Sequence, residues 1–232
     1  MINDLIKNRY SARTWTNQEI DDYKTNYIVE AACNAPSKQS LYPWKLYILG
    51  DSEESKKFKE WLFWEDTWCI NGERANPKDR NSPEKRFNGQ YRAPLLLLWA
   101  HRDLDPEKHK DENYWKYYRA YTQEQNLIDM TVSASFAMLA AEEQGLRTSF
   151  GKCHSWEFEH KIFDGGKAII GIALGIGYAE EHKDYDTMIY PVTKNQRLEG
   201  YETKNLSQNF PLKNHNIRKN KPDIKEITHV VK

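Results

Sequence analysis

The chain has 232 residues, and its 34 lysines and arginines balance 34 aspartates and glutamates, so the formal net charge is zero. This balance argues against a general nucleic-acid binder, which needs excess cationic side chains to neutralise phosphates. Only 39% of the residues are apolar, but 13% are aromatic. An aromatic content of this size is typical of a folded chain and not of a disordered one.

The three cysteines indicate a reducing compartment. Cys33, Cys69 and Cys153 are widely spaced and form no CxxC pair, which is unlike a disulfide framework. The first residues contain no apolar run of signal-peptide length, and no stretch approaches the roughly 20 apolar residues of a membrane span. We therefore expect a soluble, cytoplasmic protein with no membrane or nucleic-acid partner.

Two helices are expected from capping residues and apolar spacing. Residues 16–19, Thr-Asn-Gln-Glu, have the pattern of a capping box, and Pro36 ends the apolar run that follows, which predicts a helix near 17–34. Apolar and small residues recur at steps of three and four between 125 and 145, which predicts a longer helix with Gly145 as its C-cap.

Three strands are expected from short apolar runs next to turn signals. The runs at 44–49, 95–99 and 168–176 fit strands, and the continuity of the second run indicates burial on both faces. Gly175 and Gly177 lack the third glycine and the following helix of a dinucleotide fingerprint, so the sequence does not indicate a Rossmann fold.

We expect a single domain over residues 1–232 with two additions. The segment at about 61–91 mixes aromatic residues, charges and turn signals, which suggests an excursion that covers a pocket like a lid. From about 180 to 232 the chain is polar with few apolar residues, so it is expected to form an extended C-terminal arm across another surface.

Three segments carry side chains or backbone suited to a ligand. In an extended Arg9–Arg13 segment the alternate residues would face one anion, although a solvated basic patch is the alternative. The proline-bracketed 35–44 segment is rich in hydrogen-bond donors for a flat heterocycle, or is an ordinary helix-to-strand connection. Gly151 could let the 146–151 backbone approach a ligand, or simply form a turn.

Several common catalytic patterns are missing from the sequence. It contains no Gly-x-Ser-x-Gly elbow, Walker loop or His-Glu-x-x-His motif, and its seven histidines show no metal-ligand spacing. The adjacent Cys153 and His154 are not evidence for a nucleophile and base, since sequence neighbours seldom face each other. We expect no metal site and no catalytic side chain.

Taken in order, the segments resemble the nitroreductase family of FMN-dependent oxidoreductases. The matching features are the Arg-Tyr-Ser-x-Arg entry, the Ala-Pro-Ser loop that ends in Pro-Trp, an Arg-Ala-Pro strand, an alanine-rich helix that ends in Gly-Leu, and the Ile-Gly-Ile-Ala-Leu-Gly-Ile-Gly-Tyr strand. They span residues 2 to about 178. The resemblance implies an α+β sandwich, with a central, mostly antiparallel sheet wrapped by helices, in an intertwined homodimer that binds FMN at its interface.

The resemblance also implies roles for individual residues. Arg9 and Ser11 would hold the FMN phosphate, Arg13 would lie near the pyrimidine edge, residues 36–38 would come from the partner chain, and the backbone at 150–151 would approach flavin N5. The cofactor-binding residues implied in this way are Arg9, Tyr10, Ser11, Arg13, Pro36, Ser37, Lys38, Ser40, Phe150, Gly151, Arg218 and Lys219.

The sequence departs from the family pattern in two places that bear on flavin binding. Many members have Asn and Gln where this chain has Ser40 and Tyr42, so the hydrogen bonds to the flavin differ. The basic pair Arg218 and Lys219 follows an insertion of roughly thirty residues. Asn88 is a candidate for the side-chain amide that contacts the pyrimidine, but its spacing to Pro94 differs from the family's.

The implied activity is hydride transfer from NADH or NADPH through flavin N5 to a nitroaromatic, quinone or similar small planar acceptor. Reductive dehalogenation, flavin reduction and oxygen-dependent flavin breakdown are alternatives within the family. A non-enzymatic single-strand binder that uses the aromatic cluster at 114–121, and a scaffold that has lost FMN, are alternatives outside it.

Overall fold

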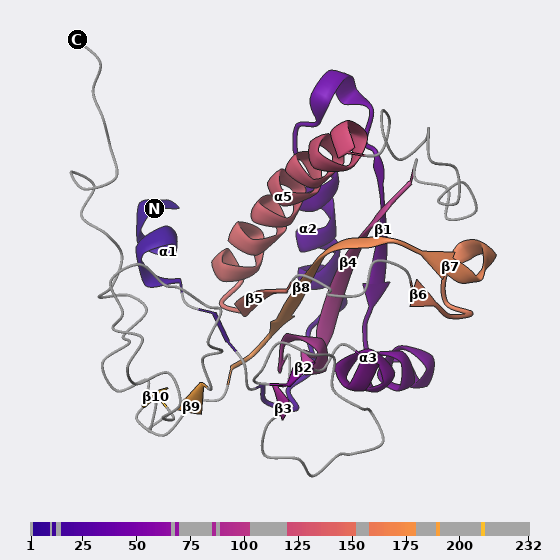
Figure 1. Cartoon of the computed structure of the whole chain (residues 1–232). Helices are drawn as coiled ribbons and strands as arrows, with labels where there is room; N and C mark the ends of the chain where they lie inside the picture. Colours follow the sequence, from indigo (N-terminus) through magenta and orange to yellow (C-terminus); the bar gives the residue numbers. More distant parts are fainter. Residues whose placement is uncertain are drawn as a thin grey trace.

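The fold is built on a four-stranded sheet with the strand order β1-β4-β8-β5, in which all neighbours are antiparallel (Figure 1). The computed structural model describes residues 2–9, 11–12, 15–65, 68–69, 85–86, 89–102, 120–151, 158–179, 189–190 and 210–211. The sheet confirms the expected α+β class. Its strands are β1 (Trp44–Leu49), β4 (Leu95–His101), β5 (Arg147–Gly151) and β8 (Ile170–Gly177).

Helices cover both faces of this sheet. One face carries α2 (Asp22–Cys33) and α5 (Ala120–Glu143), which lie side by side (Figure 1). The other face carries α3 (Glu53–Glu65) and the short 3₁₀ helix η2 (Gly89–Arg92). Leu97 and Trp99 of β4 pack toward α2 and α5, whereas Leu96 and Leu98 pack toward α3. This two-sided burial explains the unbroken apolar run in β4.

The remaining elements are short and lie around this core. Strands β2 and β3, β6 and β7, and β9 and β10 form antiparallel pairs. Their bounds, with those of the other short elements, are α1 (Ile2–Asn8), η1 (Lys38–Ser40), β2 (Trp68–Cys69), β3 (Lys85–Arg86), β6 (Phe158–Glu159), η5 (Asp164–Gly166), β7 (Lys167–Ala168), β9 (Ile189–Tyr190) and β10 (Phe210–Pro211).

The predicted start of α2 is wrong, because the helix begins at Asp22 and not after the capping-box pattern at 16–19. The segment before α2 is extended and runs beside the end of β8. The Thr16 amide donates to the Tyr178 carbonyl at 2.8 Å, and Trp15 pairs with Ala179. These long-range contacts keep residues 17–20 out of the helix. The Thr16 hydroxyl accepts a bond from the Gln18 amide at 3.3 Å, which lies before the start of α2 and does not cap it.

Gly145 follows the last turn of α5 and stops the helix, as expected. This residue has φ of +78°, a conformation that glycine adopts without the steric cost of a Cβ. The Leu146 amide donates to the Ala141 carbonyl at 3.0 Å and the Gly145 amide donates to the Glu142 carbonyl at 3.1 Å. These two bonds define a Schellman motif, which turns the chain directly from α5 into β5.

A buried hydrogen-bond chain fixes α5 between the sheet and α2. Trp99 Nε1 donates to the Ser133 hydroxyl at 2.9 Å, and Ser133 Oγ donates to the Ala32 carbonyl at 2.7 Å. Trp99 and Ser133 are almost fully buried. Because an unmade buried hydrogen bond is costly, these contacts specify the relative positions of β4, α5 and the end of α2.

The two predicted additions to the domain fall mainly outside the described residues. Helix α3 continues to Glu65, so residues 61–65 are helical and Phe63 is part of the core. Most of the rest of 61–91, and most of 180–232, lies outside the described residues. Within the part of the chain that the structure describes, every helix is too short or too polar to cross a membrane.

Replacing Ser133 by alanine is expected to lower the free energy of unfolding by about 1–3 kcal/mol, because buried polar groups of Trp99 and Ala32 lose their partner. Urea unfolding followed by tryptophan fluorescence measures this. The matched control is Ser135→Ala, since the Ser135 hydroxyl bonds only to the Thr131 carbonyl of its own helix. Equal stability of the two variants would contradict the role given to Ser133.

Candidate functional site

The N-terminal segment lies along the outer edge of β5. Ser11 forms a parallel bridge with Thr148, and the Ala12 amide donates to the Thr148 carbonyl at 3.0 Å. Gly151 lies three residues further along β5, about 10 Å from this bridge. The structure therefore brings three predicted site residues, Ser11, Phe150 and Gly151, to one edge strand. Arg9, two residues before Ser11, is half-buried.

A buried carboxylate lies at the start of the same strand. Glu142 is 4% exposed and accepts bonds from Arg147 Nη1 at 2.7 Å and from the Thr148 hydroxyl at 3.1 Å. Burial raises the pKa of this carboxyl, while Arg147, Thr148 and the charge of Arg9 act in the opposite direction. Arg9 is therefore close enough to Glu142 for the two charges to interact.

Gln90 of η2 packs against the face of β5 and β8 that points away from α2 and α5. A Cβ on Gly151 would lie 2.6 Å from Gln90 Nε2, and a Cβ on Gly175 would lie 2.3 Å from the Gln90 carbonyl oxygen. At Gly175 the close atom is backbone, so only glycine leaves room for η2 there, whereas a Cβ on Gly151 would require the Gln90 side chain to shift. Ser149 shares this face of β5 by strand alternation, and its fully buried hydroxyl has no hydrogen-bond partner among the described residues. An amide and an unused hydroxyl thus lie beside the Gly151 backbone.

The 36–42 loop, which is part of the predicted 35–44 segment, is mostly exposed and is held from two sides. The Lys38 amide donates to Asp129 Oδ2 of α5 at 3.1 Å, and Arg102 Nη2 donates to the Leu41 carbonyl at 2.8 Å. Within the loop, the Tyr42 amide donates to the Ser37 hydroxyl at 2.9 Å. Its other predicted site residues, Pro36 and Ser40, are exposed as well.

The structure does not bring this loop to the β5 edge within one chain. Asp129 contacts the loop and Glu142 contacts the start of β5, and these two residues are 13 positions apart on α5. At about 1.5 Å per residue, these two anchoring residues lie about 20 Å apart along the helix, one near its middle and one at its C-terminal end.

Four predicted site residues cannot be compared with the structure. Tyr10, Arg13, Arg218 and Lys219 lie outside the described residues, so their assignments stay predictions. Asn88, named as a candidate for a pyrimidine contact, lies outside them too.

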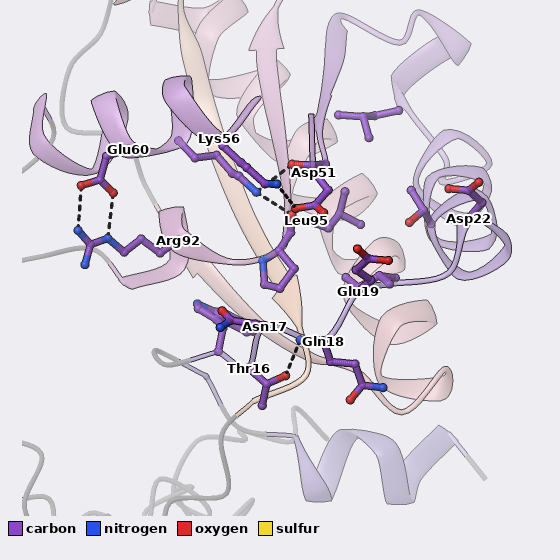
Figure 2. Close-up of a pocket in the computed structure, with 17 residues that line it drawn as sticks. Thr16, Asn17, Gln18, Glu19, Asp22, Asp51, Lys56, Glu60, Arg92 and Leu95 are labelled. Carbon is purple, nitrogen blue, oxygen red and sulfur yellow. Dashed lines mark hydrogen bonds and ion pairs between the residues drawn. The ribbon is translucent and has the colours of Figure 1, made fainter. Parts of the chain in front are cut away.

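The described residues also line an open groove of about 710 Å³ at the end of β1 and the start of β4. Figure 2 shows that its charges face one another: Lys56 pairs with Asp51 at 3.3 Å and Arg92 pairs with Glu60 at 3.0 Å. Lys59 Nζ donates to the carbonyls of Gly50, Ala93 and Pro94 at 2.7–3.0 Å. None of the predicted flavin-binding residues that the structure describes lines this groove, so it is not the site implied by the sequence.

Sequence reasoning missed four polar residues of these two groups. Their roles depend on contacts outside their own elements: Asp129 accepts the amide of Lys38, 91 residues away, and Glu142 bonds to Arg147 and Thr148 of β5. Polar residues inside an alanine-rich helix, where burial is expected, were a usable signal for two of them. The missed residues are Gln90, Asp129, Glu142 and Ser149.

The comparisons identify the family. The Nitroreductase family model matches residues 6–154, and no curated protein matches the sequence. Among solved structures, a nitroreductase family protein of Clostridium novyi is 18% identical, with a TM-score of 0.51 over 78% of this chain and 86% of that one. A provisionally named NAD(P)H:FMN oxidoreductase of Staphylococcus epidermidis is 16% identical, with a TM-score of 0.54 over 78% of this chain and 88% of that one.

A third similar structure is a provisionally named nitroreductase of Exiguobacterium sibiricum in complex with FMN, which is 19% identical, with a TM-score of 0.52 over 77% of this chain and 88% of that one. Since the family model covers most of the chain, the protein belongs to the nitroreductase family and is an oxidoreductase by class. Among the described residues, no three potential metal ligands gather in one place.

The raised pKa of Glu142 should make the free energy of unfolding depend on pH. Its folded-state pKa is raised above 4.5, so above about pH 4.5 the unfolded chain releases a proton that the native protein still holds. The free energy of unfolding of the wild type should therefore fall with rising pH, relative to that of Glu142→Gln, until Glu142 ionises in the native state. Urea unfolding of both proteins from about pH 4 to 8 measures the difference. Parallel curves would contradict the raised pKa.

Proposed function

We propose that the protein is an FMN-dependent oxidoreductase that transfers hydride from NADH or NADPH to a nitroaromatic, quinone or similar small planar acceptor. The observation that carries the proposal is the position of Ser11 beside Thr148, at the start of the strand that continues to Phe150 and Gly151. One strand edge thereby offers groups for an anion at one end and a glycine backbone beside Gln90 at the other.

The residues on this edge fit the two ends of FMN. Arg9 supplies a guanidinium and Ser11 a hydroxyl for the phosphate, as arginine forks do for phosphate oxygens. Near Gly151, the Ser149 hydroxyl lacks a partner among the described residues, and the Gln90 side chain packs against the glycine backbone. When bound, FMN would supply the hydride chemistry, so the chain needs to supply orientation and electrostatics only.

We propose that a second copy of the chain completes each site. Asp129, which contacts the 36–42 loop, lies about 20 Å along α5 from Glu142 at the start of β5, so the loop would contact the flavin of the partner. Two large apolar side chains on α5, Ile128 and Phe136, are 57% and 43% exposed. They are eight residues apart and therefore on one face, which a homodimer interface would bury.

The purified protein should be yellow, and the released chromophore should be FMN. Anaerobic addition of NADH or NADPH should bleach the absorbance near 450 nm, and a nitroaromatic or quinone should restore it. Absorbance spectra and chromatography of the released flavin measure both steps. A protein that cannot be loaded with FMN would disprove the proposal, whereas a loaded protein that neither nucleotide bleaches would need another reductant.

Arg9→Ala should weaken FMN binding by about tenfold to a hundredfold, because a charge-assisted contact to the phosphate is lost. Fluorescence titration of the apoprotein with FMN measures the dissociation constant, and riboflavin, which lacks the phosphate, should not distinguish the variant from the wild type. Lys161→Ala is the charge-matched control, since Lys161 is exposed and pairs with Glu54 away from β5. Unchanged FMN affinity in Arg9→Ala would remove the phosphate assignment.

A further inference from the structure

The loop between α2 and β1 has a backbone conformation that its residues do not favour. Gln39, Ser40 and Tyr42 have φ angles of 54°, 55° and 44°, in the left-handed region that residues with a Cβ seldom adopt. A bulky tyrosine is especially uncommon there. Such a backbone persists only where surrounding contacts impose it, so the contacts around this loop decide its shape.

Asp129 makes the partly buried contact that ties the strained part of the loop to α5, and an exposed one joins Lys38 Nζ to Gln125 Oε1 at 3.4 Å. Its Oδ2 accepts the Lys38 amide at 3.1 Å, directly before Gln39. Asp129 is 5% exposed, so water competes little for its side-chain oxygen, and a hydrogen bond in such a setting is stronger than one in water. The carboxylate therefore has a larger hold on the loop than a surface hydrogen bond would have.

The helix that carries Asp129 is itself fixed. Ser133 follows Asp129 by four residues, so both lie on the same face of α5. Through Ser133, that face bonds to Trp99 of the sheet and to the Ala32 carbonyl near the end of α2. The loop's anchor and the helix that leads into the loop thus share one rigid support.

A partner molecule would contact the exposed side of the loop. Leu41 and Tyr42 are 56% and 38% exposed, and Lys38, Gln39 and Ser40 are exposed too. A loop held in one shape before binding loses less conformational entropy when it binds. The strain in this loop is therefore useful only if the held shape is the one that binds.

We propose that Asp129 is a positioning residue that holds the 36–42 loop in the conformation that binds the flavin of a second copy of the chain. This inference rests on the proposed function. Asp129 acts through the Lys38 amide and does not itself touch the cofactor. Its removal should release the loop without disturbing the core.

The first test compares Asp129→Ala with Asp129→Asn in the full-length protein. Asparagine keeps an oxygen that can accept the Lys38 amide, whereas alanine does not. The dissociation constant for FMN should rise about tenfold or more in Asp129→Ala and stay within about threefold of wild type in Asp129→Asn. The control is Glu124→Ala, which removes an exposed carboxylate from the same helix and should leave FMN affinity unchanged. Wild-type affinity in Asp129→Ala, or equal losses in both Asp129 variants, would overturn the proposal.

A second measurement reports on the loop without FMN. Lys38 is exposed within the loop, so trypsin cleavage after it in the apoprotein measures how often the loop leaves its held shape. Cleavage should be about tenfold faster in Asp129→Ala than in Asp129→Asn, Glu124→Ala or wild type. Unchanged cleavage would overturn the holding role, whereas a wild type that never binds FMN would overturn the proposed function.

Mixed dimers test whether the loop acts on the partner's flavin. In a dimer of one Arg9→Ala chain and one Asp129→Ala chain, sites shared between chains would combine both defects in one site and leave the other intact. Such dimers, isolated with two affinity tags, should bind one FMN per dimer with wild-type affinity. Two weakened sites would show that each chain's loop serves its own strand edge and would overturn the proposal.

Discussion

The chain of hydrogen bonds from Trp99 through Ser133 to the Ala32 carbonyl is the contact on which the arrangement of the site depends. It fixes α5 against β4 and against the end of α2 at one point. Both groups of proposed cofactor residues are therefore positioned by α5, because Asp129 bonds to the 36–42 loop and Glu142 bonds to the start of β5. The helix therefore acts as a spacer of about 20 Å between two partial binding surfaces.

The sequence predicted the central elements because their signals are local. The strand at 44–49 has the predicted bounds, the runs at 95–99 and 168–176 lie largely within β4 and β8, and Gly145 ends α5 as expected. These segments are continuous apolar runs or a helix with a glycine stop, whose structure depends little on distant residues.

The elements that the sequence did not predict depend on distant contacts or have mixed composition. The capping-box pattern at 16–19 failed because Thr16 bonds to Tyr178, a contact that no local rule contains. The strand β5 is short and polar, and it forms because β8 and the Ser11 segment pair with it. At the site, Asp129 was missed for the same reason, since its role exists only once α5 lies beside the 36–42 loop.

The distance between the two partial surfaces also bears on the symmetry of the proposed dimer. Each chain has one loop surface near Asp129, in the middle of α5, and one strand-edge surface near Glu142, at the C-terminal end of α5. In a twofold dimer, if residue i of one copy meets residue j of the other, j of the first also meets i of the second. Two α5 helices packed antiparallel through Ile128 and Phe136 would therefore bring the loop of each chain to the strand edge of the other. That arrangement would form two complete sites from one interface, and neither chain could form a complete site alone.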